Sequence, residues 1–387
     1  MSPSNYSHWL NPQACAVADL DALVRTPTQL ADYPLASSIT QGVPVYDCAH
    51  IRHGSPALRR DYMAEWCRVW RDGPGVLVLQ AAFADPSVVD AATAQFHQRI
   101  AAERLLGTKA DHFAKPGAND RVWNALEKLC VAAPEVFAAY YGNPLLAWVC
   151  EAWLGPAYQV TSQINSVNPG GAAQMAHRDY HLGFLSAAQA TLYPAHVHQL
   201  SPALTLQGAV AHVDMPLESG PTLYLPHSQK YLPGYLVAGQ PDFQAYFDAQ
   251  HVQLPLKKGD AVFFNPALMH AAGHNRSADI YRMANLLQVS SAFGRAMESV
   301  DRLRMCLALY PALRGMGPAE QASAVAACAE GYAFPTNLDR NPPVGGLAPE
   351  SQQGLLLRAL QEDWPFEQLT GALQQQAQKN LTHQESL

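Results

Sequence analysis

The chain has 387 residues, of which 49% are hydrophobic and only 15% are charged, and its formal net charge is −7. This length allows one large domain, and we expect a single domain spanning residues 1–387. The acidic balance and the lack of any basic cluster disfavour a nucleic-acid partner, because phosphate binding needs clustered Lys and Arg.

The seven cysteines are scattered singly along the chain, and none forms a C-x-x-C pair. This usage predicts reduced thiols, most of them buried, and excludes a zinc ribbon or a thioredoxin-like motif. No apolar run is long enough to cross a bilayer. We therefore expect a cytoplasmic protein that has no membrane partner.

Residues 1–155 have mainly the pattern of helices. Apolar residues recur at helical spacing in 57–73, 85–106 and 143–155, and Asp85 followed by a proline is typical of a helix start. The short apolar run at 75–80 predicts the one strand of this N-terminal part.

Residues 156–295 contain short strand-like segments separated by Gly, Pro and Asp turns. Such a series predicts a mainly β core of the double-stranded β-helix class, which is a cupin-like jelly roll. Helical patterns return in residues 296–387 and predict a C-terminal helical extension. The strand-like segments are 157–168, 204–215, 222–226, 252–256, 260–265 and 282–290.

Nine of the fifteen histidines lie between His177 and His274, within the predicted β core. On an extended strand, residues two apart project to the same face, so His177 and Asp179 would point together and Arg178 would point away. One imidazole and one carboxylate form a ligand pair that suits Fe(II), Mn(II) or Zn(II).

A third metal ligand has to come from a distant segment. His270, at the end of the apolar run DAVFFNPALMH, is the best candidate, and His274 in the following turn is the alternative. His181 would share the face of His177 if the strand continued, which makes it a rival ligand or a pocket residue. Two histidines and one carboxylate leave metal positions open, as in non-haem iron oxygenases.

Arg282 begins the strand-like segment that follows His270 and lies twelve residues after it. A guanidinium at this place is suited to a bidentate grip on a carboxylate, although an exposed, ion-paired arginine is an equally good interpretation. A metal with open positions beside an arginine suggests a 2-oxoacid that chelates the metal at one end and is held at the other.

These residues, in this order, resemble the phytanoyl-CoA dioxygenase family of Fe(II)/2-oxoglutarate-dependent oxygenases over about residues 74–292. The family pattern is H-x-D, a distant histidine and then an arginine, and these positions are His177, Asp179, His270 and Arg282 in this chain. The turn and strand ESGPTLYLPHSQK, residues 218–230, is similar to the family's E-N-G-P turn and the strand after it.

The resemblance implies a catalytic Fe(II) bound by His177, Asp179 and His270, with 2-oxoglutarate and O₂ as cosubstrates. It also implies contacts to 2-oxoglutarate from a larger set of side chains, which are Arg282, Thr222, Gln163 and Asn165. Family members often have a serine two residues after the distal histidine, where this chain has Ala272. That hydroxyl is therefore missing or comes from elsewhere, for example from Thr222.

The function implied by the resemblance is hydroxylation of a C–H bond in a small organic metabolite, with release of succinate and CO₂. Related halogenases replace the carboxylate residue with Gly or Ala, so Asp179 favours hydroxylation. The candidate substrate contact is His181, and the low Lys and Arg content disfavours a CoA thioester.

Two other functions remain open from the residues alone. One is a zinc-dependent hydrolase that uses the same His/Asp/His site, and the other is a non-catalytic jelly-roll binding protein. The helical extensions could cap the pocket or form a homodimer interface.

Overall fold

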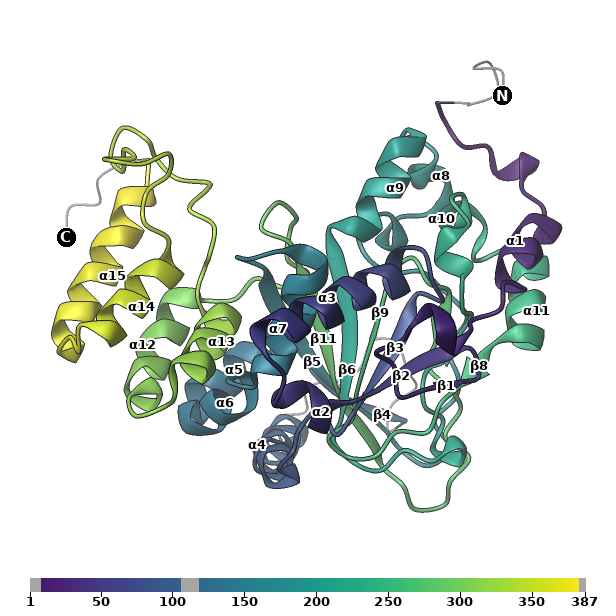
Figure 1. The fold of residues 1–387 in the computed structure, drawn as a ribbon, viewed down its shortest axis with the longest axis horizontal. Helices are drawn as coiled ribbons and strands as arrows, with labels where there is room; N and C mark the ends of the chain where they lie inside the picture. The colour runs from purple at the N-terminus through teal and green to yellow at the C-terminus, as the bar shows by residue number, and fades with distance from the viewer. Residues whose placement is uncertain (1–7, 106–117, 383–387) are drawn as a thin grey trace.

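The computed structural model describes residues 8–105 and 118–382, and a large sheet runs through their centre (Figure 1). In the described residues this sheet has eight strands, and a smaller sheet has three. In spatial order the large sheet contains β1 (Ser38–Thr40), β2 (Val43–Asp47), β3 (Val76–Gln80), β9 (Ala261–Phe264), β6 (Thr205–Ala211), β11 (Arg282–Ser290), β5 (Gln159–Val167) and β4 (Asn119–Val122). The small sheet contains β10 (His270–Ala271), β7 (Leu223–Tyr224) and β8 (Val252–Gln253).

From β5 onward the chain passes back and forth between the two sheets. It runs from β5 through a bridge at His177 in the small sheet to β6, then through β7 and β8 to β9, and finally through β10 to β11. The four large-sheet strands of this series are antiparallel neighbours in the order β9-β6-β11-β5. This alternation is the double-stranded β-helix, or jelly roll, so the predicted fold class is confirmed.

The N-terminal part contains more strands than the sequence predicted. Besides the expected β3, the large sheet includes β1, β2 and β4. A two-residue turn with positive φ at Gln41 and Gly42 joins β1 to β2. The expectation of one strand is wrong because these segments are short, β2 contains Pro44, and the sequence of β4, NDRV, is mostly polar.

The predicted helices of the N-terminal part are present, with ends that their capping residues explain. Ser55 accepts a hydrogen bond from Leu58 at the start of α3 (Pro56–Arg71). Asp85 accepts a hydrogen bond from the amide of Ser87 at the start of α4 (Pro86–Leu105). Residue 106, which was predicted to belong to this helix, lies outside the described residues. α7 (Pro144–Leu154) ends at Gly155, which has a positive φ.

The other helices lie around both sheets and include the predicted C-terminal extension. They are α1 (Val17–Val24), α2 (Cys48–Arg52), α5 (Ala125–Ala132), α6 (Pro134–Tyr141), α8 (Ala187–Ala190), α9 (Ala195–Ala203), α10 (Gly234–Val237), α11 (Pro241–Gln250), α12 (Arg302–Leu313), α13 (Pro318–Cys328), α14 (Gln352–Gln361) and α15 (Phe366–Asn380).

Alternation along the strands divides the large sheet into two apolar faces. Side chains such as Leu77, Phe263 and Leu287 belong to the main core, which they share with α3 to α7 and with α12 to α15. Their strand neighbours Val78 and Val262 point to the opposite, inner face. α12 and α13 pack against the helices α5 to α7 on the outer side of the sheet, and α14 and α15 lie beyond them (Figure 1). The use of these C-terminal helices as a dimer interface stays a prediction.

A second apolar cluster attaches helices to the small sheet. Phe243 and Phe247 of α11 pack there with Leu20 of α1 and with Met269 and Ala271 around β10.

All seven cysteines are free of disulfides. Among the helices of the described ranges, none has the length and apolar character needed to span a membrane.

Candidate active site

The inner faces of the two sheets enclose a cavity of about 810 Å³. Four alternate residues of β11 line it, namely Arg282, Ala284, Leu286 and Gln288. Side chains two apart share one face of a strand, so the register of β11 determines which of its residues reach the cavity. The volume is in the range of small-molecule sites in proteins.

His177 and His270 face each other across an antiparallel bridge between two short segments. The amide of His177 donates to the carbonyl of His270 at 3.0 Å, and the amide of His270 donates back at 3.1 Å. Directly opposed residues project to the same side, so the two imidazole rings lie 4.5 Å apart between centroids. The extended pairing expected at His177 is limited to this isolated bridge.

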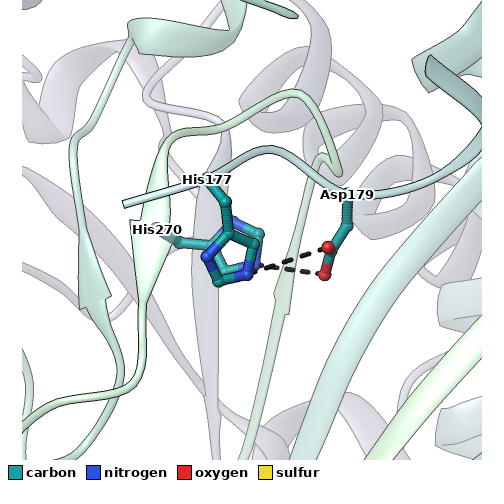
Figure 2. A group of neighbouring side chains, drawn as sticks. All are labelled: His177, Asp179 and His270. Carbon is teal, nitrogen blue, oxygen red and sulfur yellow. Dashed lines mark ion pairs between the residues drawn. The ribbon is translucent and has the colours of Figure 1, made fainter. Parts of the chain in front are cut away.

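Asp179 places its carboxylate in front of both rings (Figure 2). Nε2 of His177 lies 3.7 Å from Oδ1 of Asp179, and Nε2 of His270 lies 3.4 Å from Oδ2. One ligand atom from each of the three residues lies within 4.8 Å of the others, which is the spacing of a metal-binding group. The structure thus brings together the three residues that the sequence grouped.

The backbone orients both histidine rings toward this carboxylate. Nδ1 of His177 lies 2.9 Å from the carbonyl oxygen of Met175, and Nδ1 of His270 lies 2.8 Å from that of Leu268. A carbonyl oxygen only accepts hydrogen bonds, so each Nδ1 holds the proton and donates it. Each Nε2 therefore presents its lone pair to the space in front of Asp179, as a metal ligand must.

The protonation states of the cluster also suit a metal ion. Burial lowers the pKa of His177 below its usual value, and the neighbouring His270 lowers it further, so the ring is neutral at pH 7. Burial alone would raise the pKa of Asp179. The two histidines beside it and a hydrogen bond from Gln207 outweigh that effect, and the pKa of Asp179 lies well below its usual range. Neutral imidazoles and an ionised carboxylate are the forms that bind metals.

Gln207 is a site residue that the sequence interpretation missed. Its Nε2 donates to Oδ2 of Asp179 at 2.6 Å and lies 3.2 Å from Oε1 of Gln288. Gln207 and Gln288 are direct partners in the β6–β11 pair, and both line the cavity. The available sequence signal was one glutamine within each of two segments predicted as strands.

Arg282 lies on the cavity wall at the start of β11 and is only 6% exposed. Burial lowers the pKa of its guanidinium to about 10, which leaves it cationic at neutral pH. Among the residues that the structure describes, its Nη1 has no hydrogen-bond partner. A buried cationic donor without an acceptor is costly, and an anionic ligand in the cavity would supply that acceptor.

The other predicted cosubstrate contacts also line the cavity. Thr222 and Ala272 lie on its small-sheet side, and Gln163 and Asn165 lie on β5 of the large sheet. Oδ1 of Asn165 has no hydrogen-bond partner in the described part of the chain, whereas Oε1 of Gln163 accepts a hydrogen bond from Nη1 of Arg121 at 2.9 Å.

The structure separates His270 from its rival and turns Arg178 away from the cluster. His274 is exposed in the loop after β10 and does not belong to the metal-binding group. The guanidinium of Arg178 is buried, donates to the carbonyl of Ser228 and lies against the ring of Tyr235. The prediction that Arg178 points away from His177 and Asp179 is therefore confirmed.

His181 does not share the face of His177 and Asp179, and that expectation is wrong. Tyr180 and His181 both have positive φ angles, so the chain turns after Asp179 into the short 3-10 helix η4 (His181–Phe184). Nδ1 of His181 lies 3.5 Å from Oγ of Ser201. Among the described residues, the cavity wall includes Phe184 but not His181, so contact of His181 with the substrate stays a prediction.

The comparison with known protein families agrees with the geometry of the site. The family model described as phytanoyl-CoA dioxygenase (PhyH) matches residues 52–284, which is more than half of the chain. No curated protein sequence matches this chain significantly.

Three solved structures are similar to this chain at low sequence identity. The non-haem alpha-ketoglutarate-dependent epimerase SnoN from nogalamycin biosynthesis is 20% identical, with 62% of this chain and 85% of that chain covered and a TM-score of 0.41. The carbocyclase SnoK from the same biosynthesis is 21% identical, with the same coverage and a TM-score of 0.39. HygX from Streptomyces hygroscopicus, with nickel and 2-oxoglutarate bound, is 16% identical, with 61% and 90% covered and a TM-score of 0.39.

The family match includes the bridge at His177, the carboxylate of Asp179, the β10 histidine His270 and the buried Arg282. It therefore shows that the chain belongs to the phytanoyl-CoA dioxygenase family and is an Fe(II)- and 2-oxoglutarate-dependent oxygenase.

Proposed function

We propose that His177, Asp179 and His270 bind the catalytic Fe(II), and that the enzyme hydroxylates a C–H bond of a small organic molecule. Succinate and CO₂ are released from 2-oxoglutarate in the same turnover. The observation that carries this proposal is the convergence of two Nε2 lone pairs and one ionised carboxylate on a cavity that also contains a buried arginine.

The donor set fits Fe(II). Two imidazoles and one carboxylate form a site of intermediate hardness, and binding on one face leaves three metal positions for other ligands. A zinc-dependent hydrolase could use the same three ligands, but it would give no role to the unpartnered Nη1 of Arg282 in the cavity.

Arg282 is the residue that would bind the far carboxylate of 2-oxoglutarate. Its guanidinium is cationic, buried and open toward the cavity, which favours a charge-assisted hydrogen bond with a carboxylate. Thr222 lines the same cavity and can supply the hydroxyl that Ala272 lacks. Asn165 faces the cavity next to β11, where it pairs with Ala284, and remains a candidate contact.

The chain's own residues bind, orient and shield the reactants. When bound, Fe(II) supplies the oxidising power with O₂ and 2-oxoglutarate, and that chemistry belongs to the metal and the cosubstrate. The backbone carbonyls of Met175 and Leu268 hold the two imidazoles in the metal-binding tautomer. Apolar wall residues such as Phe264 and Leu286 exclude bulk water from the cavity.

Asp179 also favours hydroxylation over halide transfer. Its carboxylate faces both histidines and would occupy the metal position that a halide would need. The small-molecule nature of the substrate follows from the size of the cavity, about 810 Å³, which must also hold 2-oxoglutarate.

Anaerobic addition of Fe(II) and 2-oxoglutarate tests the proposal directly. We expect a visible metal-to-ligand charge-transfer band in the wild type, a weakened or lost band in Asp179→Ala and a lost band in His270→Ala. His274→Ala is the matched control, because His274 is exposed outside the cluster, and this variant should keep the band. A wild type without the band, or an unchanged band in Asp179→Ala and His270→Ala, would contradict the proposed centre.

A further inference from the structure

We propose that Met175 and Phe184 form the substrate-selective mouth of the cavity, and that the substrate presents an uncharged aromatic ring system to them. This inference deepens the proposed function and rests on it, since both side chains lie close in the chain to the metal-binding residues. Neither residue was linked to the substrate by the sequence pattern.

Both side chains line the cavity and are nevertheless largely exposed. Met175 is 68% exposed and Phe184 is 55% exposed. Such values are high for large apolar side chains on a cavity wall and are typical of a ligand-binding site. An apolar group bound in the cavity would remove both side chains from water, which is favourable.

The backbone that carries Met175 is fixed by hydrogen bonds. The amide of Ala176 donates to Oε1 of Gln244 at 3.1 Å, and Nε2 of Gln244 donates back to the carbonyl of Ala176 at 2.7 Å. The carbonyl of Met175 itself accepts the Nδ1 hydrogen bond of His177. The exposed thioether therefore lies on an anchored segment, two residues before a metal-binding histidine.

Phe184 is brought to the mouth by a tight turn after the H-x-D group. Tyr180 has a φ of 64° and His181 a φ of 42°, and such strained backbone is concentrated at functional sites. The turn leaves no room for a side chain at Gly183, where a Cβ would collide with the carbonyl of Arg178. The ring of Phe184 then packs against the buried ring of Tyr180, with 5.7 Å between the centroids. The protein thus holds Phe184 from the side of Tyr180 and leaves its exposed part for a ligand.

The chemistry of the two side chains favours an aromatic partner over a saturated one. A phenyl ring gains from edge or offset contacts with another aromatic ring, beyond the area that it buries. The sulfur of a thioether also makes favourable contacts with aromatic rings. A saturated group of equal size would gain only from burial. Met175 and Phe184 together therefore predict an aromatic ring in the substrate.

The segments that carry the mouth favour an uncharged substrate. In residues 152–213 the only charged side chains are those of Arg178 and Asp179. Arg178 is buried and donates to the carbonyl of Ser228, and Asp179 belongs to the metal-binding group. A molecule that approaches over these segments meets apolar and neutral polar side chains.

The remaining charged side chains of the cavity wall have other roles. Besides Arg178 and Asp179, the described residues of the wall include two arginines, Arg121 and Arg282. Arg121 donates to Oε1 of Gln163, and Arg282 is assigned to 2-oxoglutarate by the proposed function. A charged substrate group would be desolvated at the mouth without a dedicated counter-ion from the described wall, which is costly. The ring that reaches the mouth is therefore uncharged.

Three small probes test the inference: 2-naphthylmethanol, its saturated analogue decahydro-2-naphthylmethanol, and 2-naphthoate. Calorimetric titrations are made anaerobically on the chain loaded with Fe(II) and 2-oxoglutarate. We expect 2-naphthylmethanol to bind roughly 3- to 30-fold more tightly than its saturated analogue, because only the aromatic ring gains from the ring and sulfur contacts. 2-Naphthoate should bind more weakly than 2-naphthylmethanol.

Leucine variants separate recognition of the ring from a purely structural role. Phe184→Leu keeps an apolar side chain but loses the ring, so most of the preference for the aromatic alcohol should disappear, while the affinity for the saturated analogue stays. Met175→Leu loses the sulfur and should lose a smaller part of the preference. Phe293→Leu is the matched control, because Phe293 is 77% exposed, lies against Tyr332 and is not among the described residues of the cavity wall. It should bind all three probes as the wild type does.

Several outcomes would overturn the aromatic mouth. Equal affinity of the wild type for the two alcohols, no binding of either, or an unchanged preference in Phe184→Leu would each do so. Loss of the preference in Phe293→Leu would show that the probes bind elsewhere, and tighter binding of 2-naphthoate than of 2-naphthylmethanol would overturn the uncharged class. Failure of the proposed function is distinguishable, because it removes the 2-oxoglutarate band, whereas the aromatic preference can also be measured on the metal-free chain.

Discussion

Gln207 donates a hydrogen bond of 2.6 Å from its Nε2 to Oδ2 of Asp179, the same carboxylate oxygen that faces Nε2 of His270 at 3.4 Å. Gln288, directly opposite on β11, lies within 3.2 Å of the Gln207 amide through its own Oε1. This pair of glutamines limits the rotation of the carboxylate, so the ligand oxygen is positioned before a metal binds.

Gln207→Leu should weaken Fe(II) binding by roughly 10- to 100-fold, because a ligand without its supporting hydrogen bond is less well oriented. Gln288→Leu should have a smaller effect in the same direction, since Gln288 acts through Gln207. Anaerobic Fe(II) titration measures both affinities, and the unfolding midpoint of each variant serves as the control for folding. Wild-type iron affinity in Gln207→Leu would show that Asp179 needs no such support.

Arg282→Gln should raise the dissociation constant of 2-oxoglutarate by roughly 10- to 100-fold, because the charge-assisted hydrogen bond to its carboxylate is lost. Fe(II) affinity in the absence of 2-oxoglutarate should stay unchanged, since Arg282 is not a metal ligand. Titration of the charge-transfer band with 2-oxoglutarate measures the first quantity. If this variant had the wild-type dissociation constant for 2-oxoglutarate, Arg282 would not be a contact of the cosubstrate.

Thr222→Val tests whether Thr222 supplies the hydroxyl that Ala272 lacks. We expect its 2-oxoglutarate affinity to fall by roughly three- to tenfold, which is the effect of one neutral hydrogen bond. Adding Ala272→Ser to this variant should restore part of the loss, because Ala272 lines the same cavity. Additive, independent effects of the two substitutions would contradict a shared hydrogen-bonding role.

Gly234→Ala should destabilise the fold and weaken metal binding together. A Cβ at Gly234 would collide with the guanidinium of Arg178, which is buried next to Asp179 in the chain. Overpacking of this kind costs about 1–3 kcal/mol in the free energy of unfolding. Gly239→Ala is the matched control, because nothing lies within 4 Å of its Cβ position. Equal urea midpoints for the two variants would refute the steric explanation.

His212 should make the stability of the metal-free chain depend on pH. Its ring is buried, with Nδ1 2.8 Å from Oγ1 of Thr93 and Nε2 3.0 Å from the hydroxyl of Tyr140. Burial lowers its pKa to about 3, while an unfolded histidine titrates near pH 6.5. Between these values the unfolded chain binds the extra proton, so the free energy of unfolding falls as the pH decreases from 6.5 toward 3.

The expected slope from this one group approaches about 1.4 kcal/mol per pH unit. Urea unfolding at several pH values between 7 and 4.5, with a chelator present, measures it. His212→Gln should unfold at a lower urea concentration, and its free energy of unfolding should depend less steeply on pH. An equally steep dependence in this variant would assign the effect to other groups.

Local patterns in the sequence were sufficient to predict the main helices and strands and the residue types of the candidate metal centre. The segment 282–290 was predicted as a strand and is β11, because alternation along one strand depends only on neighbouring residues. The H-x-D group, the distal His270 and Arg282 were identified by residue type and order, since metal and carboxylate binding need particular side chains. These features do not depend on knowing which strands pair.

Tertiary structure alone decided which other side chains surround the centre. Arg121 and Gln207 reach the cavity only because β4 pairs with β5 and β6 pairs with β11, and such long-range register has no local signal. His181 was misplaced because the backbone turns at Tyr180 with a positive φ, a conformation imposed by packing and not by strand alternation. The short strands β1 and β2 exist because a neighbouring sheet edge supplies the hydrogen bonds that their own sequences would not stabilise alone.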